Sequence, residues 1–272
     1  MIKKIFLFFF VVGIALLILN IFGFFMSLRN ADIYTETEVL FKDDIIFSHK
    51  EVKGGIIRKA HESDREYVFR VNRAVNKGVA HYWKDEGIRK YNLRVPIWEN
   101  YLLYFNYFNK KYEYSNYKKA IERGAGLCSQ QAIIVTGILN DNGINAQIIG
   151  LDGHIVLTAE VENNIWHIVD PDYGIIMPYD ISEIEKNPEI VRLYYQDIEN
   201  QYRGDNGISA DEIIKIYGKE GNYICQNGVV GYKGMKAYDE YLSYIYIWVI
   251  PFVIIIVSCI CTRLFNTLKN KL

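Results

Sequence analysis

Two long apolar runs near the ends of the chain are the clearest pattern in the sequence. In residues 5–26 the only strongly polar side chain is Asn20, and residues 241–262 carry no charged side chain. Each run is long enough to cross a hydrocarbon core of roughly 30 Å. Buried core helices are the alternative, but such helices rarely need apolar residues on all faces. The first run lacks a signal-peptide cleavage site, so we predict two uncleaved transmembrane helices.

Basic residues around these runs suggest an orientation. Five flank the chain ends, namely Lys3, Lys4, Arg263, Lys269 and Lys271, and three lie on the loop side, namely Arg29, Lys233 and Lys236. Cytoplasmic loops carry the excess of Lys and Arg. We therefore expect residues 1–4 and 263–272 in the cytoplasm and residues 28–240 outside it, and the inverted topology stays open.

Weaker patterns divide the segment between the two runs. A capping box at Ser63-Asp64-Arg65-Glu66, followed by valines at helical spacing, predicts a helix over about 64–80. A second capping box begins at Ser209. Three further expectations are a helix in the aromatic stretch 98–107, short strands or extended chain over 30–60, and a Gly-rich loop over 219–236.

Composition excludes several classes of protein. The 272 residues are 50% hydrophobic with a net charge of -1, which excludes a disordered chain and gives no field for nucleic acid. Four cysteines are too few for a disulfide framework at this length. The chain has 22 tyrosines, and many of them lie in 101–117. A stacking surface for bases or sugars is one interpretation, but without a basic stripe an aromatic-rich core is favoured, and we expect no nucleic-acid partner.

Candidate chemistry begins at Cys128. Residues 129–140 have apolar positions at helical spacing, and Gly143 fits a left-handed stop. Cys128 therefore lies in the first turn of a helix. Free N–H groups and the positive end of the helix dipole lower a thiol pKa there and favour the nucleophilic thiolate.

Three strand-like runs follow this helix, at 146–150, 154–160 and 165–170. His154 opens the second run and Asp170 closes the third, so we expect them to face each other across an antiparallel hairpin, with Cβ atoms about 5 Å apart. Two even-numbered residues share a face only if the loop has an odd number of residues or a bulge adds one. We expect a three-residue loop over 161–163 with Asn163 near the left-handed region.

A thiol, a histidine and an aspartate in this order match the nucleophile, base and orienter of cysteine acyl transfer. Cys128 would attack an acyl carbonyl, His154 would hold the thiolate and protonate the leaving amine, and Asp170 would orient the imidazole. The Cys128 N–H would be one oxyanion donor. Candidates for a second donor are Asn116, Tyr117 and Gln130.

The motifs RGAGLCSQ, NGINAQIIG, GHIV and WHIVDP resemble those of the transglutaminase-like superfamily of papain-type cysteine enzymes. The matching positions are Gly126, Cys128, Gly143, Ile144, Ala146, His154, Asp170 and Pro171. The resemblance implies an α+β fold with a core over about 60–180, in which the nucleophile helix packs on an antiparallel sheet. It also implies the Cys128, His154 and Asp170 triad, used without a cofactor on a peptide, protein or amide-bearing envelope substrate. One departure is Ile155-Val156, where the family often has an aromatic residue.

Each candidate has a competing interpretation. Cys128 could pair with Cys225, the only other cysteine outside the apolar runs. His167 could replace His154, but its odd number places it on the face opposite to Asp170. Asp170 before a proline could start an Asx turn and still orient His154. Zinc needs about four ligands at characteristic spacing, so we expect no metal. A non-catalytic binding or scaffold module at the membrane is the alternative to an enzyme.

Overall fold

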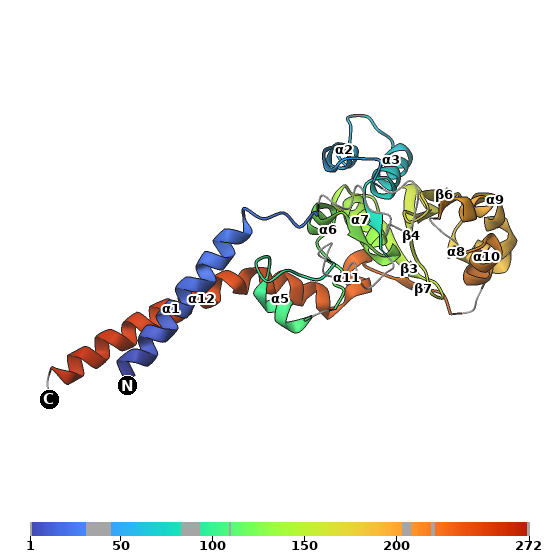
Figure 1. Cartoon of the computed structure of the whole chain (residues 1–272). Coiled ribbons are helices and arrows are strands. Elements are labelled where there is room, and N and C mark those ends of the chain that lie inside the picture. Colours follow the sequence, from blue (N-terminus) through green and yellow to red (C-terminus); the bar gives the residue numbers. More distant parts are fainter. Residues whose placement is uncertain are drawn as a thin grey trace. The chain divides into compact units, whose positions relative to one another are not determined.

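The computed structural model describes residues 2–30, 45–82, 93–108, 110–202, 208–218 and 221–270 (Figure 1). The chain forms two compact units. The first comprises Met1–Leu28, Arg94–Tyr112 and Tyr238–Leu272, and the second comprises Arg29–Leu93 and Glu113–Ala237. Together they contain both helices and an antiparallel sheet, which confirms the mixed α+β class.

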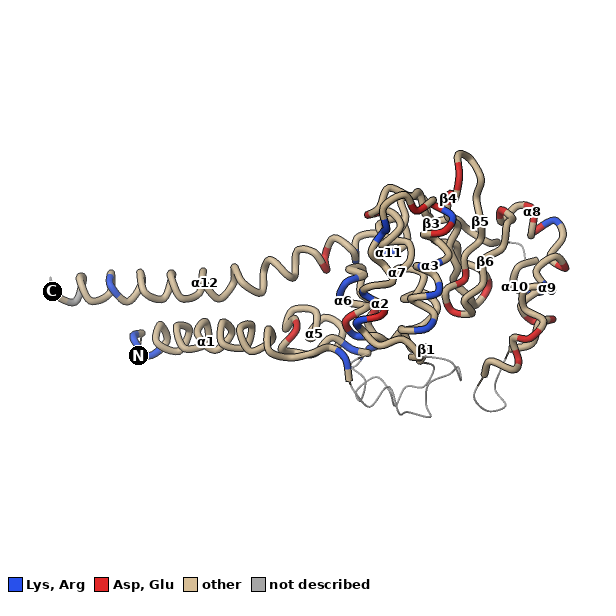
Figure 2. The backbone as a smooth tube through the Cα atoms, turned by 90° about the horizontal axis from the view of Figure 1, so that it is seen from above, with Lys and Arg blue, Asp and Glu red and all other residues tan. Residues whose placement is uncertain are grey.

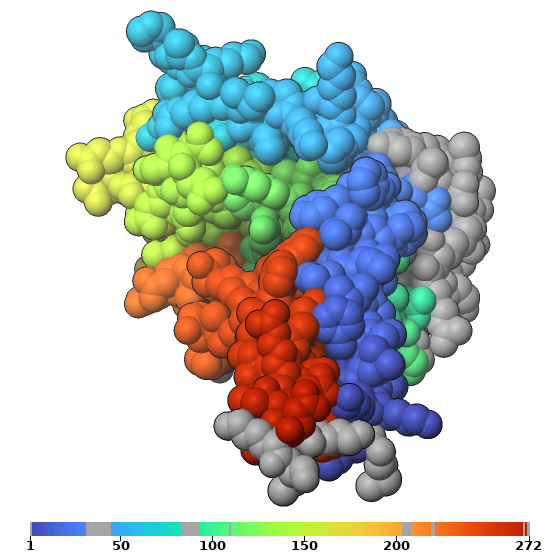
Figure 3. All heavy atoms as spheres, turned by 90° about the vertical axis from the view of Figure 1, so that its left-hand side faces the viewer, coloured from blue at the N-terminus to red at the C-terminus, as the bar shows by residue number. Residues whose placement is uncertain are grey.

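The first unit is built on two long helices, α1 (Ile2–Gly23) and α12 (Met235–Lys269). They lie side by side in all three views (Figures 1, 2 and 3). Both are long and apolar enough to cross a membrane, and few of their residues are buried. Phe8 is 62% exposed and Ile256 is 55% exposed. Core helices of a soluble protein bury such side chains, so these helices fit a membrane location.

A hydrogen bond to α12 explains Asn20, the one strongly polar residue in the apolar run of α1. Pro251, inside α12, has no N–H, so the Ile247 carbonyl four residues earlier loses its helical donor. Asn20 Nδ2 donates to that carbonyl at 2.6 Å, and the Tyr101 hydroxyl of α5 (Tyr101–Asn106) donates to it at 3.3 Å. Asn20 therefore satisfies a backbone group that hydrocarbon would leave without a partner.

Close approach of α1 and α12 depends on Gly13. A Cβ atom there would lie 2.7 Å from the Ile255 side chain and 3.1 Å from the Pro251 carbonyl oxygen. Small residues at such a crossing allow helix backbones to approach each other. The pair therefore packs by shape as well as by the Asn20 hydrogen bond.

The second unit contains a five-stranded antiparallel sheet in the order β6-β5-β4-β3-β7. Its strands are β3 (Ala146–Gly150), β4 (Ile155–Glu162), β5 (Ile165–Asp170), β6 (Ile175–Met177) and β7 (Tyr223–Cys225). The loop predicted over 219–236 is wrong where the structure describes it, because β7 pairs with β3 and α11 (Gly228–Lys233) follows it. Pairing with a distant strand supplies the order that this short, Gly-rich stretch does not specify locally.

Helix α7 (Cys128–Asp141) packs on β3 and β4, and α3 (Asp64–Asn76) and α6 (Tyr117–Arg123) pack against α7. The capping box predicted at the start of α3 is present, with Ser63 Oγ accepting from the Glu66 N–H. The start of the predicted helix is thus confirmed, although α3 ends four residues before position 80.

Two short elements lie outside the main sheet of the second unit. Strand β1 (Ala80–His81) pairs in parallel with β2 (Ala125–Gly126), which comes just before α7. Helix α2 (His49–Gly55) begins at a capping box formed by Ser48 and Glu51, so the extended chain predicted over 30–60 is wrong there. Residues 31–44 of that prediction lie outside the described residues.

A lobe of short helices covers the β6 end of the sheet (Figure 1). It consists of α8 (Ile181–Lys186), η2 (Pro188–Val191), α9 (Arg192–Tyr195), η3 (Ile198–Gln201) and α10 (Ala210–Gly218). Tyr195, Tyr202 and Tyr217 are buried in its core. In the crowded stretch 101–117, Tyr101, Tyr112 and Tyr114 are also buried, as an aromatic-rich core requires.

Candidate functional site

The Cys128 thiol is held at the first residue of α7. Leu127 is the N-cap and supplies no side-chain cap, so the free N–H groups of the first turn are not satisfied by that side chain. The loop before it is fixed by Arg123, which is 1% exposed and donates to the Ala125 carbonyl and to Gln130 Oε1, both at 2.8 Å. The helix-start position predicted for Cys128 is confirmed.

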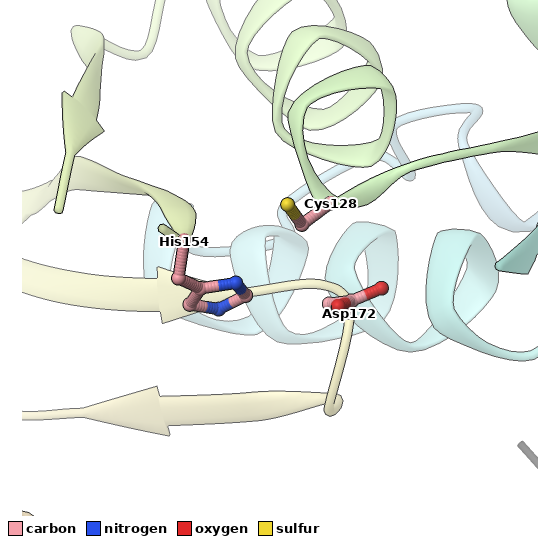
Figure 4. A group of neighbouring side chains, drawn as sticks. All are labelled: Cys128, His154 and Asp172. Atoms are coloured by element: carbon pink, nitrogen blue, oxygen red, sulfur yellow. The ribbon is translucent and has the colours of Figure 1, made fainter. Parts of the chain in front are cut away.

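His154 and Asp170 meet as a buried pair. His154 Nε2 lies 2.8 Å from Asp170 Oδ2, and the two side chains are 7% and 0% exposed. The ring also interacts with Cys128, whose sulfur lies within 4.8 Å of a ring nitrogen. With Nε2 facing Asp170, Nδ1 is the ring nitrogen on the thiol side (Figure 4). The structure thus brings together all three residues that the sequence nominated.

The hairpin achieves this pairing differently from the prediction. Glu160 pairs with Trp166 and Glu162 with Ile165, so a bulge lies at Val161, and the turn residue with positive φ is Asn164 at 59°. The three-residue loop with Asn163 near the left-handed region is wrong, and the bulge supplies the extra residue. In this register Asp170 lies diagonal to His154, because continuing the ladder would place position 172 opposite 154.

Asp170 is saturated with hydrogen bonds. Its Oδ2 accepts from His154 and from the Tyr195 hydroxyl at 2.8 Å, and its Oδ1 accepts from the Asp172 and Tyr173 N–H groups at 3.1 and 3.4 Å. The two backbone bonds form the Asx turn that the sequence suggested. Asp170 therefore both shapes the turn and orients His154.

The environment of His154 favours the imidazolium. Complete burial disfavours the charged ring, but the Asp170 carboxylate and the Cys128 sulfur outweigh it and raise the pKa of His154 well above its usual range. A protonated imidazole beside the sulfur is the partner that stabilises a thiolate. The geometry is therefore suited to a thiolate–imidazolium pair.

A second histidine–aspartate pair, which the sequence did not reveal, lies on the other side of the thiol. His81 Nδ1 and Asp172 Oδ1 form a close contact, each side chain being 2% exposed, and Gln131 Nε2 donates to the same oxygen at 3.2 Å. Ligand atoms of Cys128, His154 and Asp172 all lie within 4.8 Å of one another (Figure 4). The only sequence signal for Asp172 is its place in the turn after Asp170.

None of the three residues nominated as a second oxyanion donor fits that role, because each is engaged elsewhere. The Asn116 side chain caps α6 by accepting from the Lys118 N–H, and the Tyr117 hydroxyl donates to Asp141 at 2.9 Å, at the far end of α7. Gln130 is fully buried, and its Nε2 donates to the Tyr114 carbonyl at 2.9 Å. The Tyr232 phenol of α11 is another candidate, because it interacts with Ser129 and with the charge of Cys128.

The competing residues, Cys225 and His167, do not take the places that the alternatives gave them. Cys225 is a free thiol in β7, and burial raises its pKa. The disulfide alternative is therefore wrong, since Cys128 is free as well. His167 pairs with Ala159 within the sheet, and burial, followed by the charge of Arg65, lowers its pKa. It lies on the sheet face opposite to Asp170, as its position in the sequence indicated.

A narrow cavity of about 70 Å³ opens at the thiol. Cys128, His154 and Asp172 line one part of it, and the rest is formed by Tyr173, Tyr202 and side chains from the lobe, namely Ile208, Ile213 and Ile216. The surroundings of the thiol are therefore mostly apolar apart from the two acid–base pairs.

The same atoms could hold a metal ion. Cys128, His154 and Asp172 each offer one ligand, whereas tetrahedral zinc takes four, one of which is water in catalytic sites. Asp172 is not among the ligands that the sequence pattern suggests, so the expectation of no metal stays a prediction. The hydrogen bond between His154 Nε2 and Asp170 fixes the orientation of the ring. That orientation would suit either a metal ligand or an acid–base catalyst.

No family model, curated protein or solved structure matches the chain.

Proposed function

We propose that the protein is a membrane-anchored, transglutaminase-like cysteine enzyme that cleaves or transfers an acyl group through a thioester on Cys128. The observation that carries the proposal is the meeting of three residues distant in sequence. A thiol at a helix start contacts a buried histidine, whose other nitrogen is held by a saturated carboxylate. That arrangement supplies a nucleophile, a general acid–base and an orienting group.

The proposed reaction uses the two ring nitrogens of His154 separately. The Cys128 thiolate adds to the carbonyl carbon of an amide, forming a C–S bond, and the oxygen takes the negative charge. The Cys128 N–H donates to that oxygen. The Nδ1 proton of His154 passes to the amine nitrogen, the C–N bond breaks, and the amine leaves. Water or a second amine, deprotonated by Nδ1, then attacks the thioester and releases the sulfur.

The proposed resemblance to papain-type enzymes rests on the arrangement around α7. The helix packs on an antiparallel sheet and carries the thiol at its start. The histidine directly precedes β4, and the aspartate ends the neighbouring strand β5. We propose that the segment over about 60–180 is the transglutaminase-like core. The two apolar helices would anchor it, with residues 28–240 outside the cytoplasm and both termini inside.

Acyl-enzyme trapping tests this proposal. Full-length protein in mild detergent is mixed with p-nitrophenyl acetate, which has a good leaving group and needs no specific binding. We expect a burst of p-nitrophenolate and an acetyl group on the peptide that contains Cys128, removable by hydroxylamine as a thioester is. Cys225, a free thiol with a raised pKa in the same unit, is the internal control.

Two outcomes would count against an enzyme. Equal acetylation of Cys128 and Cys225 would mean that the site does not activate its thiol, and the non-catalytic module would then be favoured. Stoichiometric zinc in the purified protein, with a burst that appears only after chelation, would assign the cluster to metal binding. Adding glycinamide during turnover separates hydrolysis from transfer, because only transfer yields acetylglycinamide.

A further inference from the structure

A second, much larger cavity of about 830 Å³ lies along α3 in the same unit. One wall is a face of α3 with Arg65, Phe69, Asn72 and Arg73, and the opposite wall includes Tyr173 and Ile176. Tyr173 also lines the narrow cavity at Cys128, and its ring lies 5.5 Å from the His154 ring, centroid to centroid. Tyr173 therefore contributes to both cavities, the groove along α3 and the narrow cavity at the thiol.

The groove carries positive charge above an apolar floor. Arg65 and Arg73 are exposed residues of its lining, and Phe69 is 47% exposed within it. Basic residues lie along α3 in Figure 2. The charge of Arg70 is largely balanced by Glu62, which it contacts at 2.6 Å. The lining also contains Glu66, which is held at Ser63 by the capping box and keeps its charge, and Lys77. Arg65, Arg73 and Lys77 outnumber this acid, so the lining is positive overall, and arginines match carboxylates in geometry.

The lining offers a bound peptide an apolar and a polar contact. Ile176 of β6 supplies an apolar side chain. Asn72 is 1% exposed and donates through Nδ2 to the Ile175 carbonyl at 3.4 Å, and its Oδ1 has no hydrogen-bond partner among the described residues. An amide N–H of a bound peptide would satisfy this acceptor.

We propose that this groove, the α3 groove, binds an acidic peptide in extended form and delivers it to Cys128. Carboxylate side chains would lie against Arg65 and Arg73, and apolar ones against Phe69 and Ile176. As a substrate site this rests on the proposed function, whereas peptide binding itself does not require a reactive thiol.

Binding of defined peptides tests the proposal. Full-length Cys128→Ser protein in detergent is titrated against a fluorescein-labelled peptide of four Glu-Ala repeats and against the same peptide with Gln for Glu. We expect tighter binding of the Glu peptide, weakening as salt is raised. The double variant Arg65→Gln/Arg73→Gln should weaken binding of the Glu peptide about tenfold and leave the Gln peptide nearly unchanged.

The double variant Lys186→Gln/Lys215→Gln is the matched control. It removes the same charge from exposed residues of the lobe, so it should keep the full affinity for the Glu peptide. Equal binding of the two peptides, or equal weakening by both double variants, would overturn the proposal. So would binding of inorganic polyphosphate in preference to the Glu peptide.

Acetylation of wild-type Cys128 separates the two claims. A reactive thiol with no preference for the Glu peptide would refute peptide binding in the α3 groove but would still support the enzyme. Selective binding of the Glu peptide by a protein whose Cys128 is inert would support a peptide-binding module and refute the enzyme.

Discussion

The two sides of the Cys128 thiol use the same pair of residue types for different purposes. On one side Asp170 accepts four hydrogen bonds, of which only one comes from His154. On the other side, among the described residues, Asp172 Oδ1 contacts the side chains of His81 and Gln131. Asp170 would keep three hydrogen-bond donors without His154. Asp172, which has fewer donors, needs His81 to balance its buried charge. We infer that the first pair serves chemistry and the second mainly serves stability.

Replacing the two histidines should separate these roles most strongly. His81→Ala would leave the buried Asp172 carboxylate with Gln131, and we expect a loss of about 3 kcal/mol in the free energy of unfolding. His154→Ala leaves Asp170 with three donors and should lose about 1 kcal/mol. Chemical denaturation followed by fluorescence of Trp166, which lies in β5, measures both. An Asp172→Asn background should reduce the loss caused by His81→Ala, and an unchanged loss would show that the pair is not coupled.

Reactivity should show the opposite order. His154→Ala removes the partner of the thiolate, so alkylation of Cys128 by iodoacetamide at pH 6 should slow by about 30-fold, after allowing for the higher nucleophilicity of a more basic thiol. His81→Ala should change the rate less than His154→Ala does. Alkylation is measured on folded protein, and rates that respond alike to both variants would refute the division of roles.

The two aspartates offer a milder version of the same comparison. Asp170→Asn keeps the shape of the side chain but loses the charge that holds His154, so we expect about a tenfold slower alkylation at pH 6. Asp172→Asn removes a negative charge near the sulfur and should not slow the reaction. If alkylation were slower in Asp172→Asn than in Asp170→Asn, Asp172 rather than Asp170 would be the aspartate that supports the reactive thiol.

The smallest expected effect is on the pH dependence of stability. Because the pKa of His154 is raised in the folded protein, its contribution is fully present below the unfolded pKa of about 6.5 and is lost as the pH rises through the folded value. The difference in unfolding free energy between wild type and His154→Gln should therefore shrink toward alkaline pH. A difference that grows with pH would mean that the folded pKa is lowered instead.

Local patterns predicted the elements that bear the first pair. The strands at 146–150 and 165–170, the helix that starts at Cys128 and the shared face of His154 and Asp170 all follow from periodicity, turn residues and parity. The exact turn did not follow, because a bulge at Val161 and a loop of odd length satisfy the same parity. The sequence alone could not choose between them.

The second pair could not be predicted because nothing local relates its members. His81 and Asp172 are 91 positions apart, and they meet through β1, which pairs in parallel with the strand before α7. A two-residue strand has no periodicity to detect. Strand β7 was missed for a similar reason, since its order comes from pairing with β3.

The pH profile of Cys128 alkylation in the wild-type chain tests the central claim most directly. Full-length protein is treated with iodoacetamide between about pH 5 and pH 9, and the rates at Cys128 and Cys225 are read separately by mass spectrometry. If His154 holds a thiolate, the Cys128 rate stays nearly level below pH 6, where a free thiol of pKa about 8.5 is almost fully protonated. Cys225 should lose about tenfold per pH unit. A Cys128 profile that falls in parallel with that of Cys225 would contradict the account.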